Sequence, residues 1–251
     1  MHPSVRECLK FLGISDGISV HHDGDLPARR GMGSSSAFTV GLLHALHVLR
    51  GTRPWKEELA SEAMHVEQNR IGENVGCQDQ ILATFGGFNH VILTTEGQLS
   101  VIRINAVGLE PYLMLFDTKL SRIASAIAEE QIKQTPNRIY ELQAMSKLTT
   151  VALKLLEEKA FLDFGRLLGN TWALKRSLTK KISTPTIDSI YESALKAGAL
   201  GGKLLGAGGG GFMLFFVELN KQEKVKEALS GLMHVPFRFE NTGSQIIFEG
   251  S

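Results

Sequence analysis

Apolar residues along the chain recur at helical spacing in some segments and form short runs in others. Helical spacing predicts three helical regions, at 36–49, from 54 to about 72, and through most of 121–198. Breaks in the third region are expected at Pro136, near Gly169 and at 183–186. Short apolar runs predict strands at 17–25, 88–95, 99–104, 112–118 and 212–217.

The last forty residues predict a charged helix over 220–233 and two further strands, at 235–240 and 244–249. The order strand, helix, strand, strand favours a compact α+β domain on an antiparallel sheet. A change of pattern at 105–111 separates this half from the first. We therefore expect two domains, 1–107 and 108–251.

Composition limits the class of partner. Of the 251 residues 43% are hydrophobic, and 27 Lys and Arg against 26 Asp and Glu leave a net charge of +1, so we expect no nucleic-acid partner and no membrane docking. Cys8 and Cys77 lack the spacing of a disulfide framework or a zinc site. The charged pair Arg6 and Glu7 lies where a signal peptide would be apolar. A cytoplasmic protein with a small-molecule partner is the expectation.

The stretch GMGSSS at 31–36 places Gly31 and Gly33, followed by Ser34, Ser35 and Ser36, at the start of a helix. Free N–H groups and the positive dipole end at such a start favour an anion. The chain has no P-loop pattern, and no acidic residue follows as a dinucleotide site requires. Two interpretations remain: a nucleotide triphosphate wrapped by N–H groups, with a serine hydroxyl for Mg²⁺, or a tight helix start capped by serines.

A second glycine cluster, GAGGGG at 206–211, formally matches GxGxxG. A dinucleotide fingerprint follows a strand and opens a helix, whereas this cluster opens the strand expected at Phe212. A Rossmann site is therefore not indicated.

Two acidic residues are candidates for the chemistry. Asp79, between the amides of Gln78 and Gln80, could accept the proton of an attacking hydroxyl or cap a helix. Glu67 could give a carboxylate oxygen to Mg²⁺ or lie on the surface.

Basic residues could meet substrate phosphate. Arg29 and Arg30 precede the serines, and Lys175 and Arg176 lie near a helix end. For each pair a solvated surface position, or in the second case a favourable charge at the helix C-terminus, is the alternative.

Three stretches in this order, DLPARRGMGSSSAF, GCQDQ and KLLGAGGGGF, resemble the GHMP kinase superfamily. Further stretches, among them GCQDQILATFGGFN and LSRIASAIAEEQ, are similar to its D-glycero-D-manno-heptose 7-phosphate kinase branch. The resemblance implies a ribosomal-S5-domain-2-like N-terminal domain, a ferredoxin-like C-terminal domain, and ATP-dependent phosphoryl transfer to a sugar hydroxyl. The implied substrate is the anomeric position of the heptose 7-phosphate.

Site roles follow from the same resemblance. Gly31 to Ser36 would wrap the ATP phosphates, Ser35 and Glu67 would bind Mg²⁺ with Glu73 as the alternative to Glu67, and Asp79 would face the acceptor hydroxyl. The third family motif, which supports the nucleotide loop, corresponds to Gly206, Gly208, Gly209 and Gly210. Arg30, Lys175 and Arg176 are the substrate candidates.

The family's first motif, an arginine-led stretch with consecutive glycines and a Thr-Asp that helps to bind the sugar, has no counterpart before Met1. The resemblance therefore implies an incomplete N-terminal domain. Sheet edges left uncovered would favour association, so a homodimer is a further expectation. A kinase of fucose or galactose type and a non-catalytic nucleotide-binding remnant are the alternative functions.

Overall fold

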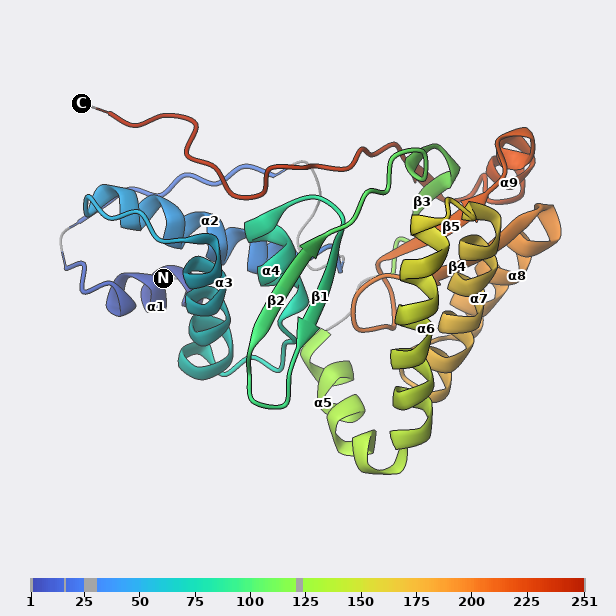
Figure 1. The fold of residues 1–251 in the computed structure, drawn as a ribbon, viewed down its shortest axis with the longest axis horizontal. Helices are drawn as coiled ribbons and strands as arrows, with labels where there is room; N and C mark the ends of the chain where they lie inside the picture. The colour runs from blue at the N-terminus through green and yellow to red at the C-terminus, as the bar shows by residue number, and fades with distance from the viewer. Residues whose placement is uncertain (1, 16, 25–30, 121–123, 251) are drawn as a thin grey trace. The chain divides into compact units, whose positions relative to one another are not determined.

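The computed structural model of the chain describes residues 2–15, 17–24, 31–120 and 124–250. Its described residues fall into two compact units (Figure 1). Unit 1 contains 2–15, 17–24, 33–103 and 240–250, and unit 2 contains 31–32, 104–120 and 124–239.

Unit 1 is a cluster of helices with a two-stranded sheet. Its elements are α1 (Pro3–Phe11), α2 (Ser34–Leu49), α3 (Lys56–His65), the π-helical turn η1 (Val66–Ile71), α4 (Gln78–Phe85), β1 (Asn89–Leu93) and β2 (Leu99–Arg103). The strands β1 and β2 pair antiparallel, as the sequence predicts. An apolar core between α1, α2, α3 and η1 includes Cys8, Leu43 and Val66. The helical cluster fixes the position at which α2 begins.

Unit 2 carries a four-stranded antiparallel sheet flanked by helices. Its helices are α5 (Ala124–Gln134), α6 (Ile139–Glu157), α7 (Phe161–Ser177), α8 (Pro185–Ala197) and α9 (Gln222–Ala228), with short 3-10 turns η2 (Glu110–Tyr112), η3 (Thr135–Asn137) and η4 (Leu219–Lys221). Its strands are β3 (Leu113–Asp117), β4 (Ala199–Leu204), β5 (Phe212–Val217) and β6 (Met233–Val235).

The sheet of unit 2 has the order β4-β5-β3-β6 with every neighbouring pair antiparallel. Helices connect β3 to β4, a short turn connects β4 to β5, and α9 connects β5 to β6. This succession on one sheet is the ferredoxin-like arrangement. The predicted α+β class and the ferredoxin-like second domain are therefore confirmed.

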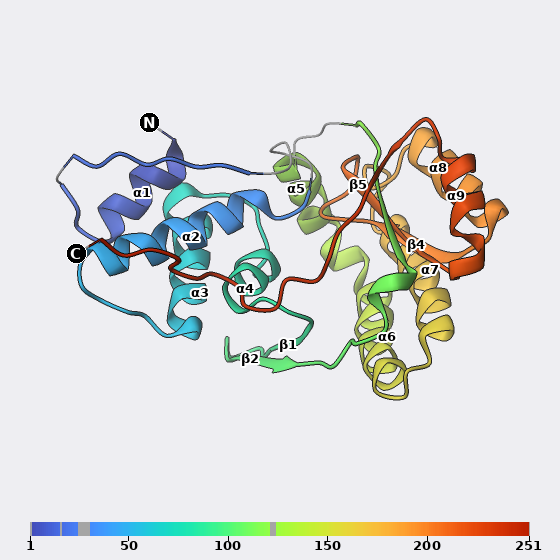
Figure 2. The same ribbon diagram turned by 90° about the horizontal axis from the view of Figure 1, so that it is seen from above.

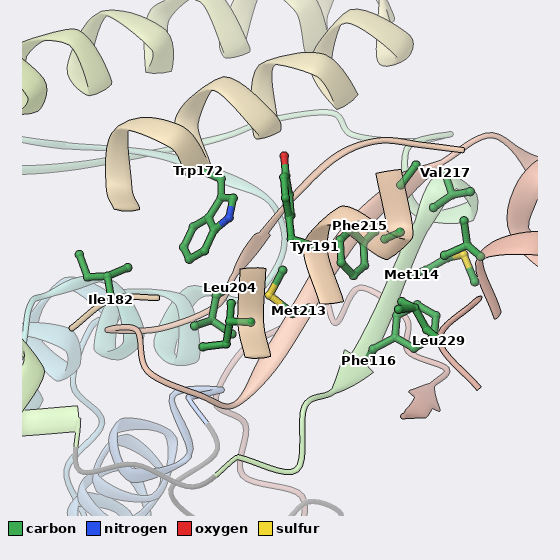
Figure 3. Close-up of a cluster of buried hydrophobic side chains, with 14 of the residues drawn as sticks. Met114, Phe116, Trp172, Ile182, Tyr191, Leu204, Met213, Phe215, Val217 and Leu229 are labelled. Carbon is green, nitrogen blue, oxygen red and sulfur yellow. The ribbon is translucent and has the colours of Figure 1, made fainter. Parts of the chain in front are cut away.

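The core of unit 2 lies between the sheet and its helices (Figure 3). Trp172 of α7 and Tyr191 of α8 pack with Phe215 of β5, and all three side chains are buried. Each fully buried large apolar side chain stabilises the fold by about 1.5–3 kcal/mol. This core supports the turn between β4 and β5, where the second glycine cluster lies.

Three expected features differ from the structure. Residues 17–24 contain no regular strand, and neither do 244–249. The strand expected at 235–240 is the shorter β6, Met233–Val235. The apolar side chains of the final segment do not form a buried face, since Ile247 is 96% and Phe248 84% exposed.

Instead of adding strands to unit 2, residues 240–250 lie along unit 1, as the red segment in Figures 1 and 2 shows. Lys56 Nζ donates to the Thr242 carbonyl at 2.8 Å, and Gly87 N–H donates to the Glu240 carbonyl at 2.6 Å. A Cβ on Gly243 would lie 2.2 Å from the Thr84 carbonyl oxygen, so only glycine allows this approach to the end of α4.

The break expected near Gly169 is also absent, because α7 runs through this residue. Gly165 and Gly169 let the helix approach the sheet closely. A Cβ on Gly165 would lie 2.5 Å from the ring of Phe216, and one on Gly201 would lie 2.2 Å from the Gly165 carbonyl oxygen. These glycines permit packing and do not end the helix.

Candidate active site

The helix α2 begins at the serine loop, which we define as Gly33–Ser36. Gly33 has a left-handed φ of +68°, and the first intrahelical bond runs from Ala37 N–H to its carbonyl at 2.9 Å. The N–H groups of Ser34, Ser35 and Ser36 therefore point beyond the end of the helix. Ser34 and Ser35 are exposed, whereas Ser36 is buried. The loop thus presents backbone donors to an anion.

Asp79 lies directly against this loop. It belongs to the first turn of α4, and its side chain is exposed. A Cβ on Gly33 would lie 3.1 Å from Asp79 Cγ. The Asp79 side chain therefore occupies the space beside Gly33, about 46 positions earlier in the sequence. The structure thus places the proposed proton acceptor beside the proposed phosphate loop.

Glu67 lies in the π-helical turn after α3, and its carboxylate is fully buried. Ser36 Oγ donates to Glu67 Oε2 at 2.8 Å, and Thr39 Oγ1 lies 2.8 Å from Oε1. Gln80 Nε2 makes a further, short hydrogen bond to Oε2. Among the described residues no Lys, Arg or His forms an ion pair with Glu67. Hydrogen bonds from α2 and α4 therefore supply the stabilisation that a buried carboxylate requires.

Glu73 lies close enough to Glu67 to sense its charge. Burial, and then the negative charge of Glu67, raise the pKa of the Glu73 carboxyl above its ordinary value of 4.5. A backbone hydrogen bond of 2.9 Å from Glu73 N–H to the Glu67 carbonyl closes the turn between them. Two carboxylates close enough to repel each other favour a divalent cation between or beside them, because the cation relieves this repulsion.

The oxygen ligands near Glu67 suit Mg²⁺. Serine hydroxyls and carboxylate oxygens are hard donors, and Mg²⁺ usually takes one or two protein carboxylates while keeping waters and substrate phosphates. Within the described residues there is no group of three or more His, Cys, Asp or Glu that could hold a metal ion. A site with few protein ligands, completed by substrate, fits this donor set.

The structure distinguishes the serines by their contacts. Ser36, and not Ser35, hydrogen-bonds to Glu67. Ser35 contributes its carbonyl, which accepts from Thr39 Oγ1 at 3.2 Å. The role of Ser35 as a metal ligand stays a prediction.

The second cluster, which we call the glycine turn (Gly206–Gly211), joins β4 to β5. Gly209 N–H donates to the Ile182 carbonyl at 2.8 Å, and Gly211 N–H donates to the Leu120 carbonyl at 3.1 Å. The Gly211 carbonyl accepts from Thr118 Oγ1 at 2.7 Å. These bonds hold the turn to its own unit.

Close packing explains why the glycine turn lacks side chains. Gly208 has a φ of +127°, and a Cβ there would lie 2.7 Å from Ile182 Cα. A Cβ on Gly210 would lie 2.6 Å from the Leu120 carbonyl oxygen. Gly208 and Gly210 are therefore required by the fold of unit 2, whatever the turn binds.

The basic candidates in unit 2 make specific contacts. Lys175 Nζ donates to the Gly206 carbonyl at 2.5 Å, so it braces the glycine turn. Arg176 pairs with Asp188 at 2.9 Å and lies over the rings of Trp172 and Tyr191. Both contacts hold parts of unit 2 together. Arg29 and Arg30 lie outside the described residues.

Sequence reasoning missed the structural part played by Thr39 and Gln80. Thr39 follows Ser36 by three positions on α2, so the two hydroxyls lie on one face of the helix. That spacing is a signal that the sequence offers. Gln80 is next to Asp79 but is fully buried while Asp79 is exposed.

Two family models match the chain in order. One, "GHMP kinases N terminal domain", matches residues 4–87, and the other, "GHMP kinases C terminal", matches residues 152–234. Together these matches cover more than half of the chain. The chain belongs to the GHMP kinase family.

Among relatives of this chain, a D-glycero-alpha-D-manno-heptose 7-phosphate kinase from Campylobacter jejuni is 35% identical over 220 residues, which cover 84% of this chain and 65% of the relative. A galactokinase from Roseiflexus is 26% identical over 250 residues, with 84% and 63% covered. The chain thus spans slightly less than two thirds of the length of these relatives.

A solved structure confirms the GHMP kinase fold. A D-glycero-D-manno-heptose 1-phosphate kinase from Bacteroides thetaiotaomicron superposes with a TM-score of 0.67 at 25% identity, over 87% of this chain and 64% of that one. Among the described helices of this chain, none has the length and apolar character needed to cross a membrane.

Proposed function

We propose that this GHMP kinase transfers the γ-phosphate of ATP to a sugar hydroxyl. The observation that carries the proposal is the contact between Asp79 and Gly33, which puts a carboxylate beside the free N–H groups of a helix N-terminus. A proton acceptor and an anion site are the two parts that phosphoryl transfer to a hydroxyl requires. The family membership of the chain supports the same reaction.

In this proposal the N–H groups at the start of α2 bind the ATP phosphates, with Ser34 and Ser35 exposed beside them. Asp79 orients the acceptor hydroxyl and accepts its proton as the new bond to phosphorus forms. Glu67, with a hydroxyl of Ser35 or Ser36, would hold Mg²⁺. Bound Mg²⁺ would neutralise charge that develops on the transferred phosphoryl group.

The glycine turn takes a supporting part in this proposal. Gly206, Gly208, Gly209 and Gly210 correspond to the third family motif, and Lys175 fixes the first of them through its carbonyl. We infer that the backbone of this turn takes part in nucleotide binding, while Lys175 acts on the turn and not on the sugar.

We propose D-glycero-D-manno-heptose 7-phosphate as the acceptor, phosphorylated at its anomeric hydroxyl to give the 1,7-bisphosphate. The Campylobacter relative carries the 7-phosphate in its name, and the Bacteroides structure carries the 1-phosphate. These two acceptors are distinguishable, because a sugar with phosphate on its anomeric oxygen has no anomeric hydroxyl left to phosphorylate. We place the reaction in the cytoplasm, in line with free Cys8 and Cys77, and propose a homodimer, which light scattering would test.

The experiment is ADP release by the purified chain with Mg²⁺-ATP, measured with each heptose phosphate, with galactose, with fucose and without acceptor. Asp79→Asn is the inactive variant, and Asp163→Asn is its control, because Asp163 is exposed and pairs with Arg166 along one helix face. Release that needs the 7-phosphate and Asp79 supports the proposal. ATP binding without acceptor-dependent release from a folded chain contradicts it and favours a nucleotide-binding remnant.

A further inference from the structure

Gln80 makes an asymmetric set of contacts. Its side chain is fully buried in the first turn of α4, directly after Asp79. Nε2 donates to Glu67 Oε2, whereas Oε1 is buried without a hydrogen-bond partner among the described residues. The reversed amide would turn a carbonyl oxygen toward the carboxylate, so the charge of Glu67 selects the observed orientation. Glu67 therefore determines how Gln80 is held.

One oxygen of Glu67 joins two functional turns. Oε2 accepts from Gln80 on α4 and from Ser36 on α2. These are the first turns of the two helices, and they carry Asp79 and the serine loop. Thr84 Oγ1 donates to the Gln80 carbonyl at 2.8 Å and fixes its backbone. The two turns that carry Asp79 and Gly33 therefore share one buried acceptor.

We propose that Gln80 is a positioning residue that links the Glu67 carboxylate to the orientation of Asp79. A cation bound at Glu67 would share the carboxylate oxygen that accepts the hydrogen bond from Gln80. Cation binding would therefore change that hydrogen bond and, through it, the position of the first turn of α4. Side chains that hydrogen-bond a metal-binding carboxylate orient it in this way. The inference rests on the proposed function for the role of Asp79, whereas its effect on cation binding is measured separately.

The test compares Gln80→Met with the wild type. Methionine has a similar length and volume but donates no hydrogen bond. Gln98→Met is the matched control, since Gln98 is exposed on the β1–β2 turn of the same unit. Mn²⁺ binding in the presence of ATP and without sugar, followed by electron paramagnetic resonance, should weaken by about 10- to 100-fold in Gln80→Met and stay unchanged in Gln98→Met. With sugar, kcat should fall by a similar factor while KM for the sugar is unchanged.

Mn²⁺ affinity within twofold of the wild type in folded Gln80→Met would overturn the inference, as would a wild type that binds no Mn²⁺ with ATP. A wild type that binds Mn²⁺ yet releases no ADP with any sugar contradicts the proposed function alone. The inference is then decided by the Mn²⁺ titration.

A second variant covers the case in which Gln80→Met does not fold. Gln80→Glu keeps the shape and places a second carboxylate against Glu67. In EDTA the thermal midpoint of Gln80→Glu should lie below that of the wild type. On addition of Mn²⁺ the midpoint should rise by more degrees in the variant than in the wild type. Equal gains in both proteins would overturn the proposed link between Gln80 and the cation.

Discussion

The serine loop of unit 1 and the glycine turn of unit 2 are both built from small residues, but their surroundings differ. In the serine loop, Ser34 and Ser35 are exposed, and the atoms nearest to a Cβ on Gly33 belong to the side chain of Asp79. In the glycine turn, Gly208 and Gly210 press against the backbone of their own unit. The small residues of the serine loop are open, as the proposed phosphate site requires, whereas those of the glycine turn pack against their own unit.

The comparison also separates two ways of fixing a loop. Side-chain hydrogen bonds hold the serine loop, through Ser36 and Thr39 to the buried Glu67. Backbone hydrogen bonds to Ile182 and Leu120 hold the glycine turn. Substitutions in the serine loop should therefore affect turnover more than stability, and substitutions in the glycine turn the reverse.

The largest effect is expected at Asp79. Asp79→Asn removes the proton acceptor but keeps the shape that rests against Gly33. We expect kcat to fall by about 10²- to 10⁴-fold, the usual loss of a general base, with the thermal midpoint nearly unchanged. Steady-state kinetics and calorimetry on the same preparation check both parts. Unchanged turnover would remove Asp79 from the mechanism.

A large stability effect is expected at Gly208. Gly208→Ala places a Cβ 2.7 Å from Ile182 Cα on a residue with φ +127°, so strain and overlap combine. We expect a loss of about 3 kcal/mol in the free energy of unfolding. Urea unfolding measures it. Gly51→Ala is the control, because Gly51 has φ +73° with nothing within 4 Å of its Cβ, and it should lose only about 1 kcal/mol. Equal losses would show that overlap at the glycine turn contributes nothing.

A smaller effect is expected at Gly33, where turnover should be affected more than stability. In Gly33→Ala the new methyl group lies 3.1 Å from Asp79 Cγ, so the carboxylate must shift by a few tenths of an ångström. We expect about a tenfold loss of kcat, since misplaced catalytic groups act poorly, and about 1 kcal/mol of destabilisation from the positive φ. Gly41→Ala, in the open middle of α2, should keep full activity. Full activity of Gly33→Ala as well would show that the contact with Asp79 does not matter for turnover.

Much of this contrast was predictable from local sequence. Two glycines and three serines before an amphipathic run specify the start of α2, because capping depends on neighbouring residues. The surroundings of Glu67 were not predictable in this way. Its partners Ser36 and Thr39 lie 31 and 28 positions earlier in the chain, so only tertiary packing decides that this helical glutamate is buried.

The same reasoning explains why some predicted strands are absent from the described residues. Residues 244–249 contain a short apolar run, Ile246–Phe248, but pairing requires an open edge, and the segment instead bonds to the rest of unit 1 from residue 240 onward. The ferredoxin-like sheet was predictable because β3 and β5 are continuous apolar runs whose side chains are mostly buried. Long apolar runs specify strands by themselves, whereas a short run depends on a partner that the local sequence does not reveal.

The smallest expected effect concerns pH and tests whether the serine loop rests on a cation site. The pKa of Glu73 is raised by burial and by the charge of Glu67, so the folded protein binds this proton more tightly than the unfolded chain. The contribution of Glu73 to stability should therefore fall as the pH rises from 4.5 to the raised pKa, and it should level off above that pKa. Glu73→Gln removes the cost of burying a negative charge at this position. The variant should therefore have the same thermal midpoint as the wild type below pH 4.5 and a higher one above the raised pKa of Glu73. With Mg²⁺ and ATP the advantage at neutral pH should shrink, because a cation near Glu67 also relieves the repulsion that Glu73 feels. An advantage that Mg²⁺ leaves unchanged would show that the two carboxylates do not share a cation, and the serine loop would then be held by hydrogen bonds alone.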